Sequence, residues 1–144
     1  MTDFSSSIVG NHARTARLLR AHDITPTAQR VEIAEIVLRV SQHLSAEQII
    51  DELRGKHRVS KATVYNSLKI FAERGLVRRV NLHSDRLIYD SNVRPHHHFY
   101  NVDTGELTDI GIESVQLSGM PQAPAGTVAE DVEIVINIRN DKPA

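Results

Sequence analysis

Helical and extended patterns occupy separate parts of this chain of 144 residues, and their separation limits the possible folds more than any other feature. Apolar residues recur at helical spacing as far as Arg74, whereas the apolar runs from Leu76 onward are short and extended. A block of helices followed by strands predicts the α+β class, because α/β folds alternate the two elements along the chain.

Start and stop signals divide the first block into four predicted helices. Ser45-Ala46-Glu47-Gln48 is a capping box, in which the serine side chain bonds a backbone N–H and the glutamine side chain reaches back. Ser60 is a second N-cap, and Gly55 and Gly75 end the two helices that these caps open. Pro26 stands where a first helical turn tolerates it. The predicted helices are residues 8–21, 28–40, 46–54 and 61–74, with residues 41–44 as a connection.

A basic hairpin is predicted directly after the fourth helix. Residues 76–82 and 86–90 are two extended runs joined by His83-Ser84-Asp85, and they carry Arg78, Arg79 and Arg86. Helices followed by such a hairpin are the layout of a winged helix-turn-helix. In that layout the second helix of the pair enters the major groove of DNA, and the hairpin, or wing, touches the backbone or the minor groove.

The last third of the chain predicts a small antiparallel sheet. Residues 99–102 and 107–110 form a hairpin, residues 118–130 form a loop, and residues 132–139 alternate apolar and polar side chains as a strand does. An isolated sheet of this size is marginally stable. We therefore expect it to bury its apolar face against a second copy, in a homodimer.

Charge is distributed unevenly about Pro95. Residues 1–94 carry 15 Lys and Arg against 10 Asp and Glu, whereas residues 95–144 carry 2 against 8, and the whole chain has a net charge of -1. A basic part joined to an acidic part indicates that the first meets a polyanion. We expect a winged-helix DNA-binding domain at residues 1–91 and a sensing and dimerisation domain at residues 92–144.

The polar face of the fourth predicted helix supplies candidate DNA contacts. Val64, Leu68 and Phe71 form its inward stripe. Tyr65, on the opposite face, can pack its ring on a thymine methyl group and donate its hydroxyl to a base. An ordinary solvated helix face is the alternative interpretation. The candidates are Lys61, Tyr65, Asn66 and Lys69 on the helix and Arg78, Arg79 and Arg86 on the wing.

Three consecutive histidines begin a predicted strand. Because a strand alternates faces, His96 and His98 project to one side and His97 to the other. Two imidazoles on one face make half a metal site, unless the run is merely a solvated polar cluster. The chain has no cysteine, which excludes thiolate metal sites, disulfides and thiol catalysis. The carboxylates that could complete a mixed N/O site are Asp90, Asp103 and Asp109.

The run Ser60-Lys61-Ala62-Thr63-Val64-Tyr65-Asn66 is followed by a hairpin and by Pro95-His96-His97-His98. Pro26-Thr27-Ala28-Gln29-Arg30, His43-Leu44-Ser45-Ala46-Glu47 and Gly75-Leu76-Val77 belong to the same pattern. Together these motifs resemble the ferric uptake regulator family of bacterial metal-responsive repressors, over roughly residues 12–110. The triple histidine followed by Phe99-Tyr100, with Asn66 after Tyr65, is most similar to the iron response regulator branch, whose members sense haem or iron status.

The resemblance implies a DNA-binding homodimer whose affinity for an AT-rich inverted repeat responds to a bound signal. The implied cofactor is a divalent metal, Fe2+ or Mn2+ with Zn2+ as a surrogate, or haem held by His96, His97 or His98. The family's basic N-terminal segment makes Arg17 a further candidate for DNA contact. The metal ligands that the resemblance implies are His43, Asp90, His96, His98 and Asp109.

The sequence departs from the family pattern in three places. Asn101 and Thr104 stand where the first cysteine pair of the family's structural zinc site would be, so no such site is expected. Pro95 and Gln116 fall where ligands of a further metal site are expected. Asn66 replaces the arginine usual in the recognition helix, which alters the expected base preference.

Other functions remain open from the sequence. A manganese- or peroxide-responsive repressor would belong to the same family. A small non-haem metal enzyme could use His96, His98 and a carboxylate as a facial triad, although it would also need a pocket and a general base. A storage or haem-carrying module would leave the basic half unexplained. No apolar run reaches membrane-spanning length and the N-terminus lacks signal-peptide features, so we expect a cytoplasmic protein.

Overall fold

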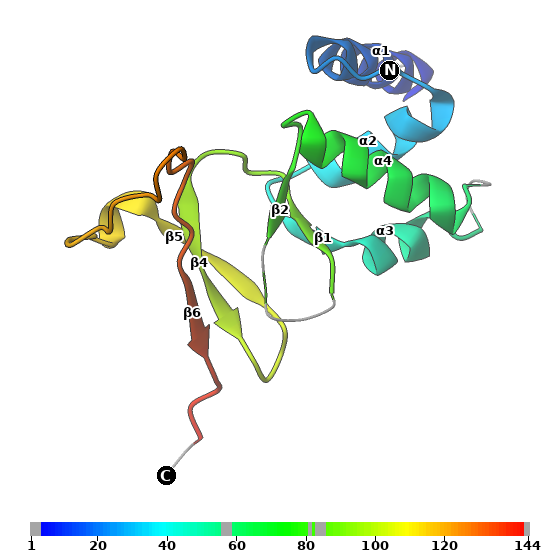
Figure 1. Cartoon of the computed structure of the whole chain (residues 1–144). Coiled ribbons are helices and arrows are strands. Elements are labelled where there is room, and N and C mark those ends of the chain that lie inside the picture. Colours follow the sequence, from blue (N-terminus) through cyan, green and yellow to red (C-terminus); the bar gives the residue numbers. More distant parts are fainter. Residues whose placement is uncertain (1–3, 56–58, 81, 83–85, 143–144) are drawn as a thin grey trace. The chain divides into compact units, whose positions relative to one another are not determined.

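The computed structural model describes residues 4–55, 59–80, 82 and 86–142. The chain forms two compact units, Met1–Val93 and Arg94–Ala144, each with its own sheet (Figure 1). Within the described residues, every α-helix lies in the first unit. The α+β class is therefore confirmed. None of the described helices combines the length and hydrophobicity needed to cross a bilayer.

Four α-helices and a three-stranded sheet make up the described part of the first unit. The helices are α1 (Phe4–Ala21), α2 (Ala28–Leu38), α3 (Ala46–Leu53) and α4 (Lys61–Glu73). The sheet has the order β1 (His43–Ser45), β3 (Ile88–Asp90), β2 (Arg78–Val80), with both pairings antiparallel. All four predicted helices are present, each ending within a few residues of its expected bounds.

The predicted caps are present and explain these bounds. Ser45 accepts from the Gln48 N–H while the Gln48 side chain accepts from the Ser45 N–H, which is the complete capping box. Ser60 accepts from the Thr63 N–H at the start of α4. Gly75 follows α4 with a φ of 76°, a left-handed conformation that favours glycine.

One hydrophobic core holds the helices together. Leu19 of α1, Ile33 of α2, Ile49 of α3 and Phe71 of α4 are each 0% exposed and belong to the same cluster. Every helix thus contributes a fully buried side chain, and burial of this kind supplies most of the stability of short helices. This core presents the outer face of α4 on a rigid support.

Strand β1 was not predicted, because residues 41–44 were expected to be a connection. Three residues are too few to display an alternating pattern, and His43 becomes part of a strand because it pairs with Asp90 of β3. The hairpin was expected to extend further as well: β2 covers only residues 78–80, and Arg86 precedes β3. The predicted connection His83-Ser84-Asp85 lies outside the described residues.

The second unit is a three-stranded sheet with the order β5 (Leu107–Gly111), β4 (His96–Asn101), β6 (Val135–Ile138). β4 and β5 form the predicted antiparallel hairpin, but β6 pairs with β4 in parallel, where an antiparallel strand was expected. Residues 112–134, which include the short 3-10 helix η1 (Ile112–Ser114), provide the long crossover that parallel pairing requires.

Candidate metal centre and nucleic-acid interface

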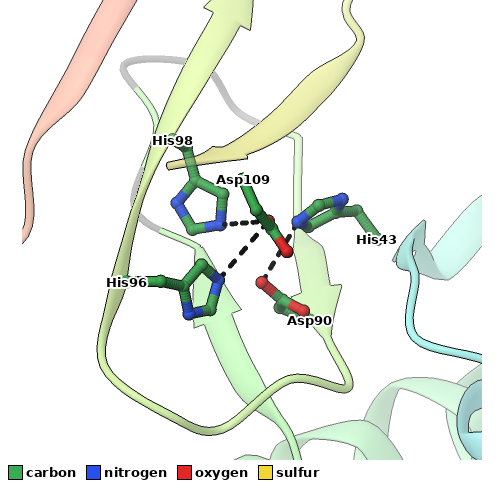
Figure 2. Close-up of side chains that lie close together, drawn as sticks. All are labelled: His43, Asp90, His96, His98 and Asp109. Carbon is green, nitrogen blue, oxygen red and sulfur yellow. Dashed lines mark ion pairs between the residues drawn. The ribbon is translucent and has the colours of Figure 1, made fainter. Parts of the chain in front are cut away.

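In the first unit, His43 and Asp90 stand opposite each other on β1 and β3. His43 Nε2 lies 3.1 Å from Asp90 Oδ2, and the Asp90 side chain is only 1% exposed (Figure 2). The other carboxylate oxygen of Asp90 accepts from the Asn92 N–H at 2.9 Å. Asp90 is therefore oriented by the backbone of the next turn, with one oxygen directed at the imidazole.

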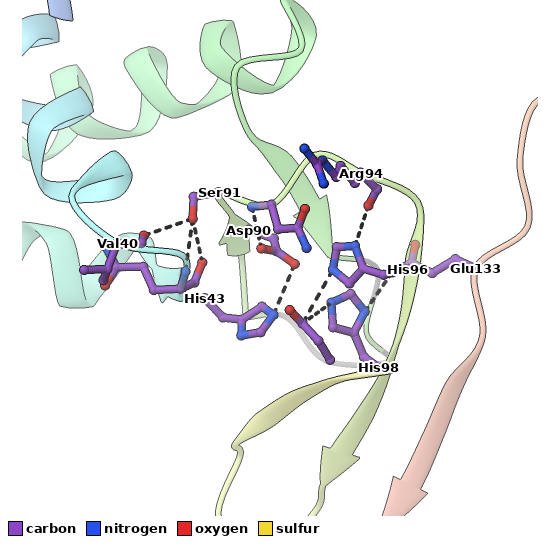
Figure 3. A network of polar contacts seen from close by, with 11 residues as sticks. Val40, His43, Asp90, Ser91, Arg94, His96, His98 and Glu133 are labelled. Carbon is purple, nitrogen blue, oxygen red and sulfur yellow. Dashed lines mark hydrogen bonds and ion pairs between the residues drawn. The ribbon is translucent and has the colours of Figure 1, made fainter. Parts of the chain in front are cut away.

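A network around Ser91 fixes the short strand that carries His43 (Figure 3). The Gln42 N–H donates to Ser91 Oγ, and the Ser91 N–H donates to the Gln42 carbonyl, at 3.0 and 3.2 Å. The Gln42 side-chain amide donates to the carbonyls of Ile36 and Val37 at the end of α2. These bonds join the C-terminus of α2 to the start of β1 and so fix the position of His43 after the helix.

In the second unit, His96, His98 and Asp109 form a second group of ligand atoms, all within 4.8 Å of one another. His98 pairs with Asp109 across the β4–β5 ladder, and His96 is two residues earlier on the same face, as predicted. Both Nε2 atoms lie 3.5 Å from Asp109 Oδ1 (Figure 2). The two imidazoles therefore converge on one carboxylate oxygen.

The opposite nitrogen of each of these rings also faces an oxygen atom. His96 Nδ1 bonds the Arg94 carbonyl, and a carbonyl only accepts, so Nδ1 carries the proton and Nε2 keeps its lone pair (Figure 3). His98 Nδ1 lies 3.7 Å from Glu133 Oε1, on a side chain that is 13% exposed. A carboxylate or carbonyl behind the imidazole is the usual support of a metal-binding histidine. Glu133 could not be recognised from the sequence, where it is one residue of an alternating apolar and polar run.

The donor set fits a divalent metal. For nitrogen and oxygen ligands bonded at 2.0–2.2 Å, neighbouring ligand atoms lie about 2.8–3.1 Å apart in octahedral geometry and about 3.3–3.6 Å apart in tetrahedral geometry. The Asp109–histidine distances of 3.5 Å and the His43–Asp90 distance of 3.1 Å match that spacing. Imidazole and carboxylate ligands suit Fe2+, Mn2+ and Zn2+, whereas the absence of cysteine argues against a thiolate site.

His97 and Asp103 have other roles. The Ile134 N–H donates to His97 Nδ1 at 3.1 Å, so the lone pair of this nitrogen is already used. Asp103 was a candidate ligand, but it lies at the tip of the β4–β5 turn, where its Oδ2 accepts from the Asn140 N–H at 2.9 Å. The metal-binding group found among the described residues does not include it.

A cluster of amide side chains occupies the position where the resemblance would place the first cysteine pair. Asn101 Oδ1 accepts from the N–H groups of Asp103 and Thr104, and Asn101 Nδ2 donates to Asn140 Oδ1 at 2.9 Å. The Asp103–Asn140 bond completes the group. Hydrogen bonds here join the turn of the hairpin to the segment that follows β6.

The outer face of α4 carries Lys61, Asn66 and Lys69, all exposed, as predicted. Tyr65 differs from the prediction, because its ring packs partly against the core and its hydroxyl donates to Glu47 Oε1 of α3 at 2.9 Å. The hydrogen bond to Glu47 raises the pKa of Tyr65. Its only hydroxyl hydrogen is therefore already donated within the protein.

The arginines of the wing face opposite sides of their sheet. The ladder places Arg78 in a row with Asp90 and His43, and Arg79 in the next row with Tyr89. Burial raises the pKa of Tyr89, and the charge of Arg79 opposes that shift. Arg79 is exposed, as are Arg86 and, on α1, Arg17. Arg78, Arg79 and Arg86 therefore stay predicted DNA contacts, with Arg78 and Arg79 on opposite faces of β2.

The remaining described histidines lie on α1 and in the turn that follows it. His12 pairs with Glu35 at 3.0 Å, and His22 bonds the Leu18 carbonyl. His57 and His83 lie outside the described residues. Pro95 and Gln116, which stand where the family pattern has ligands of a further metal site, are both exposed.

Comparisons with known proteins agree on one family. The model of the ferric uptake regulator family matches residues 22–135. The ferric uptake regulation protein of Synechococcus elongatus is 33% identical over 62% of this chain and 64% of its own length. The peroxide operon regulator of Bacillus subtilis is 30% identical over 68% of this chain and 70% of its own length.

Solved structures show the same fold. The ferric uptake regulator of Pseudomonas aeruginosa with manganese superposes with a TM-score of 0.65 at 26% identity, covering 88% of this chain and 97% of that one. The Vibrio cholerae ferric uptake regulator gives a TM-score of 0.64 at 22% identity, covering 86% and 98%. The winged-helix layout is thereby confirmed. The chain belongs to the ferric uptake regulator family, whose members are transcription regulators and not enzymes.

Proposed function

We propose that this protein is a cytoplasmic transcription regulator that binds double-stranded DNA and changes its affinity when a divalent metal binds. The observation that carries the proposal is the convergence of His96 and His98 on Asp109, with His96 Nδ1 bonded to the Arg94 carbonyl and His98 Nδ1 3.7 Å from Glu133 Oε1. Such preorganisation on both sides of the ring is the design of a metal-binding histidine.

The proposed metal ligands are His43 and Asp90 with His96, His98 and Asp109. The first two belong to the unit that carries α4, and the other three belong to the unit Arg94–Ala144. Metal binding at these residues would change DNA affinity by as much as the ion prefers the conformation that binds DNA, without touching DNA.

Iron is the signal that we propose first. Imidazole and carboxylate donors accept Fe2+, Mn2+ and Zn2+ alike, so the donor set alone does not choose among them. Three of the proteins reported above are ferric uptake regulators by name, and the fourth is a peroxide operon regulator. A manganese- or peroxide-responsive repressor built on the same ligands is therefore the alternative within the family.

Haem sensing, as in the iron response regulator branch, is a second candidate that rests on the triple histidine. His97 would be the ligand left over by the metal site, with DNA released when haem rises. Its Nδ1 accepts from the Ile134 N–H, so coordination through this nitrogen would break that bond. This bond counts against coordination of haem through His97 Nδ1.

The proposed DNA surface is the outer face of α4, with Lys61 and Lys69 on phosphates and Tyr65 and Asn66 at base edges. Arg79, Arg86 and Arg17 are exposed and would add backbone or minor-groove contacts. A homodimer on an inverted repeat, AT-rich as the family resemblance implies, would present two such surfaces one helical turn or more apart.

A mobility-shift selection tests this function. The full-length protein is incubated with a random duplex pool in the presence of chelator, Fe2+ without oxygen, Mn2+ or haemin, and the retained sequences are bound again singly. We expect an inverted repeat whose affinity differs about 5- to 150-fold between chelator and Fe2+ or Mn2+, which is the usual range of coupling between two sites.

Matched histidine variants locate the site. His98→Ala should abolish the response to metal while non-specific DNA binding remains, whereas His22→Ala, in the turn after α1, should respond as the wild type does. Retention of no sequence under any condition would refute the DNA-binding function. A full metal response in His98→Ala would refute the proposed ligand site, and loss of both the Soret band and DNA release in His97→Ala would restore haem as the signal.

A further inference from the structure

Glu47 is a carboxylate on the surface that we propose for DNA, where phosphate would repel it. It is exposed in the first turn of α3, and it accepts from the hydroxyl of Tyr65 on α4 at 2.9 Å. A negative charge in the first turn is favoured by the helix dipole, but that role does not require contact with Tyr65. The contact links the two helices of the helix-turn-helix through the side chain expected to read DNA.

The contact fixes the tyrosine at both ends. The ring of Tyr65 packs partly against the hydrophobic core, and its hydroxyl is held by Glu47. Preorganised side chains discriminate better than mobile ones, because little rotamer freedom is lost when the target arrives. Glu47 is therefore placed to control how Tyr65 meets a base.

The chemistry of the contact decides which base that is. A phenol has one hydrogen, and here it points to Glu47, so only the lone pairs of the hydroxyl oxygen remain for a ligand. The carboxylate likewise only accepts. In the major groove, adenine N6 and cytosine N4 are donors, whereas guanine N7 and O6 and thymine O4 are acceptors.

We propose that Glu47 is a specificity-determining residue, which makes Tyr65 an acceptor for the exocyclic amine of adenine or cytosine and rejects guanine or thymine edges at that position. This inference rests on the proposed DNA binding and adds to it. It replaces the expectation that Tyr65 donates its hydroxyl to a base. An acceptor edge placed against two acceptors leaves unpaired polar groups, which is a common source of discrimination.

Base analogues test the proposal on the inverted repeat selected with the full-length, metal-loaded protein. Each adenine is replaced in turn by purine, which lacks the 6-amino group, and each cytosine by 2-pyrimidinone, which lacks the 4-amino group. Affinities are measured for the wild type, Glu47→Gln, Tyr65→Phe and the double variant. We expect removal of one amine per half-site to weaken the wild type about tenfold, within the range of a specific base contact.

In Glu47→Gln and in Tyr65→Phe the same analogue should change the affinity less than about threefold. The double variant should lose no more DNA affinity than either single variant does, because the two residues act as one unit. The amide introduced by Glu47→Gln can donate to the hydroxyl oxygen of Tyr65, which frees the phenol hydrogen. This variant should therefore also raise the relative affinity for guanine or thymine at that position. Asp51→Asn removes the same charge from the same helix and is the matched control.

The outcomes separate this proposal from the proposed function. If the wild type selects a repeat but Glu47→Gln keeps the wild-type analogue profile, DNA binding stands and the role of Glu47 is refuted. If Asp51→Asn relaxes the base preference as much as Glu47→Gln does, the effect is one of net charge and the proposal is again refuted. If the wild type selects no sequence, the proposed function and this inference fail together.

Discussion

At the scale of single residues, the group that faces Nδ1 gives three identical side chains different roles. His96 donates from Nδ1 to a carbonyl, and His98 has a carboxylate near Nδ1, so both direct Nε2 to Asp109. His97 instead accepts at Nδ1 from the Ile134 N–H. The alternation of faces could be predicted from the sequence, because it follows from strand geometry alone. The protonated nitrogen could not, since it depends on what lies behind each ring.

The Tyr65–Glu47 pair can be detected in solution without DNA. The hydrogen bond to Glu47, aided by desolvation and by the carboxylate charge, raises the pKa of Tyr65 above the usual value of about 10. A raised pKa in the folded state means that the pair contributes stability below the unfolded-state pKa. That contribution is lost as the pH rises through the raised value. We expect Glu47→Gln to lower the pKa of Tyr65, measured by NMR titration of the tyrosine ring carbons.

The signal of Tyr65 is assigned as the one that disappears in Tyr65→Phe. An identical titration midpoint for Tyr65 in the wild type and in Glu47→Gln would show that the contact does not form in solution.

Neither Glu47 nor Glu133 was found from the sequence, because each meets a partner on another element far along the chain. Their spacing carries no local signal, and only the packing of α3 on α4, or of the β6 segment on β4, brings them into place.

At the scale of elements, the helices were predictable and the sheet pairings were not. Caps and periodicity are local, so Ser45, Ser60 and Gly75 fixed the bounds of α3 and α4 closely. β1 exists only because β3 pairs with it, and the direction of β6 is set by how residues 112–134 return the chain. Non-local pairing of this kind leaves no trace in the three or four residues that form the strand.

The amide cluster around Asn101 should stabilise the end of the second sheet without a metal ion. Asn101 makes three side-chain hydrogen bonds, to Asp103, Thr104 and Asn140, so Asn101→Ala should cost about 1–3 kcal/mol of unfolding free energy. Asn140→Ala should cost less, because the bond from its backbone to Asp103 remains. Urea unfolding followed by circular dichroism, in the presence of chelator, measures both.

The control is Asn137→Ala, an exposed asparagine on β6 of the same sheet. If Asn101→Ala unfolds at the same urea concentration as Asn137→Ala, the cluster contributes no stability and the departure from the family's cysteine pattern is without structural consequence. If Asn140→Ala lowers the unfolding free energy more than Asn101→Ala does, the stabilising contacts lie in the segment after β6 rather than in the turn.

At the scale of the whole molecule, the second sheet separates two kinds of surface. His96 and His98 project from one face of β4, and the paired rows Phe99–Ile136 and Asn101–Ile138 project from the other. Ile136 and Ile138 are 39% and 37% exposed, although isoleucine is usually buried. A face of this kind, on a sheet too small to be stable alone, is the reason to expect a second copy against it.

We therefore predict a homodimer that forms through the face of β6 bearing Ile136 and Ile138. Replacing both by serine removes apolar surface without adding charge, so the dimer should dissociate at least about tenfold more readily, which corresponds to roughly 1.4 kcal/mol of association free energy. Multi-angle light scattering over a dilution series gives the change directly. Val128→Ser, at a loop side chain that is 91% exposed, changes an apolar residue to serine away from the sheet and should leave the dimer intact.

A wild-type monomer at micromolar concentration, with and without metal, would refute the homodimer. A double variant as dimeric as the Val128→Ser control would show that the interface lies on another face. If the wild type is a monomer, two copies of the protein would have to assemble on the DNA to bind an inverted repeat, because a symmetric site requires two copies of α4.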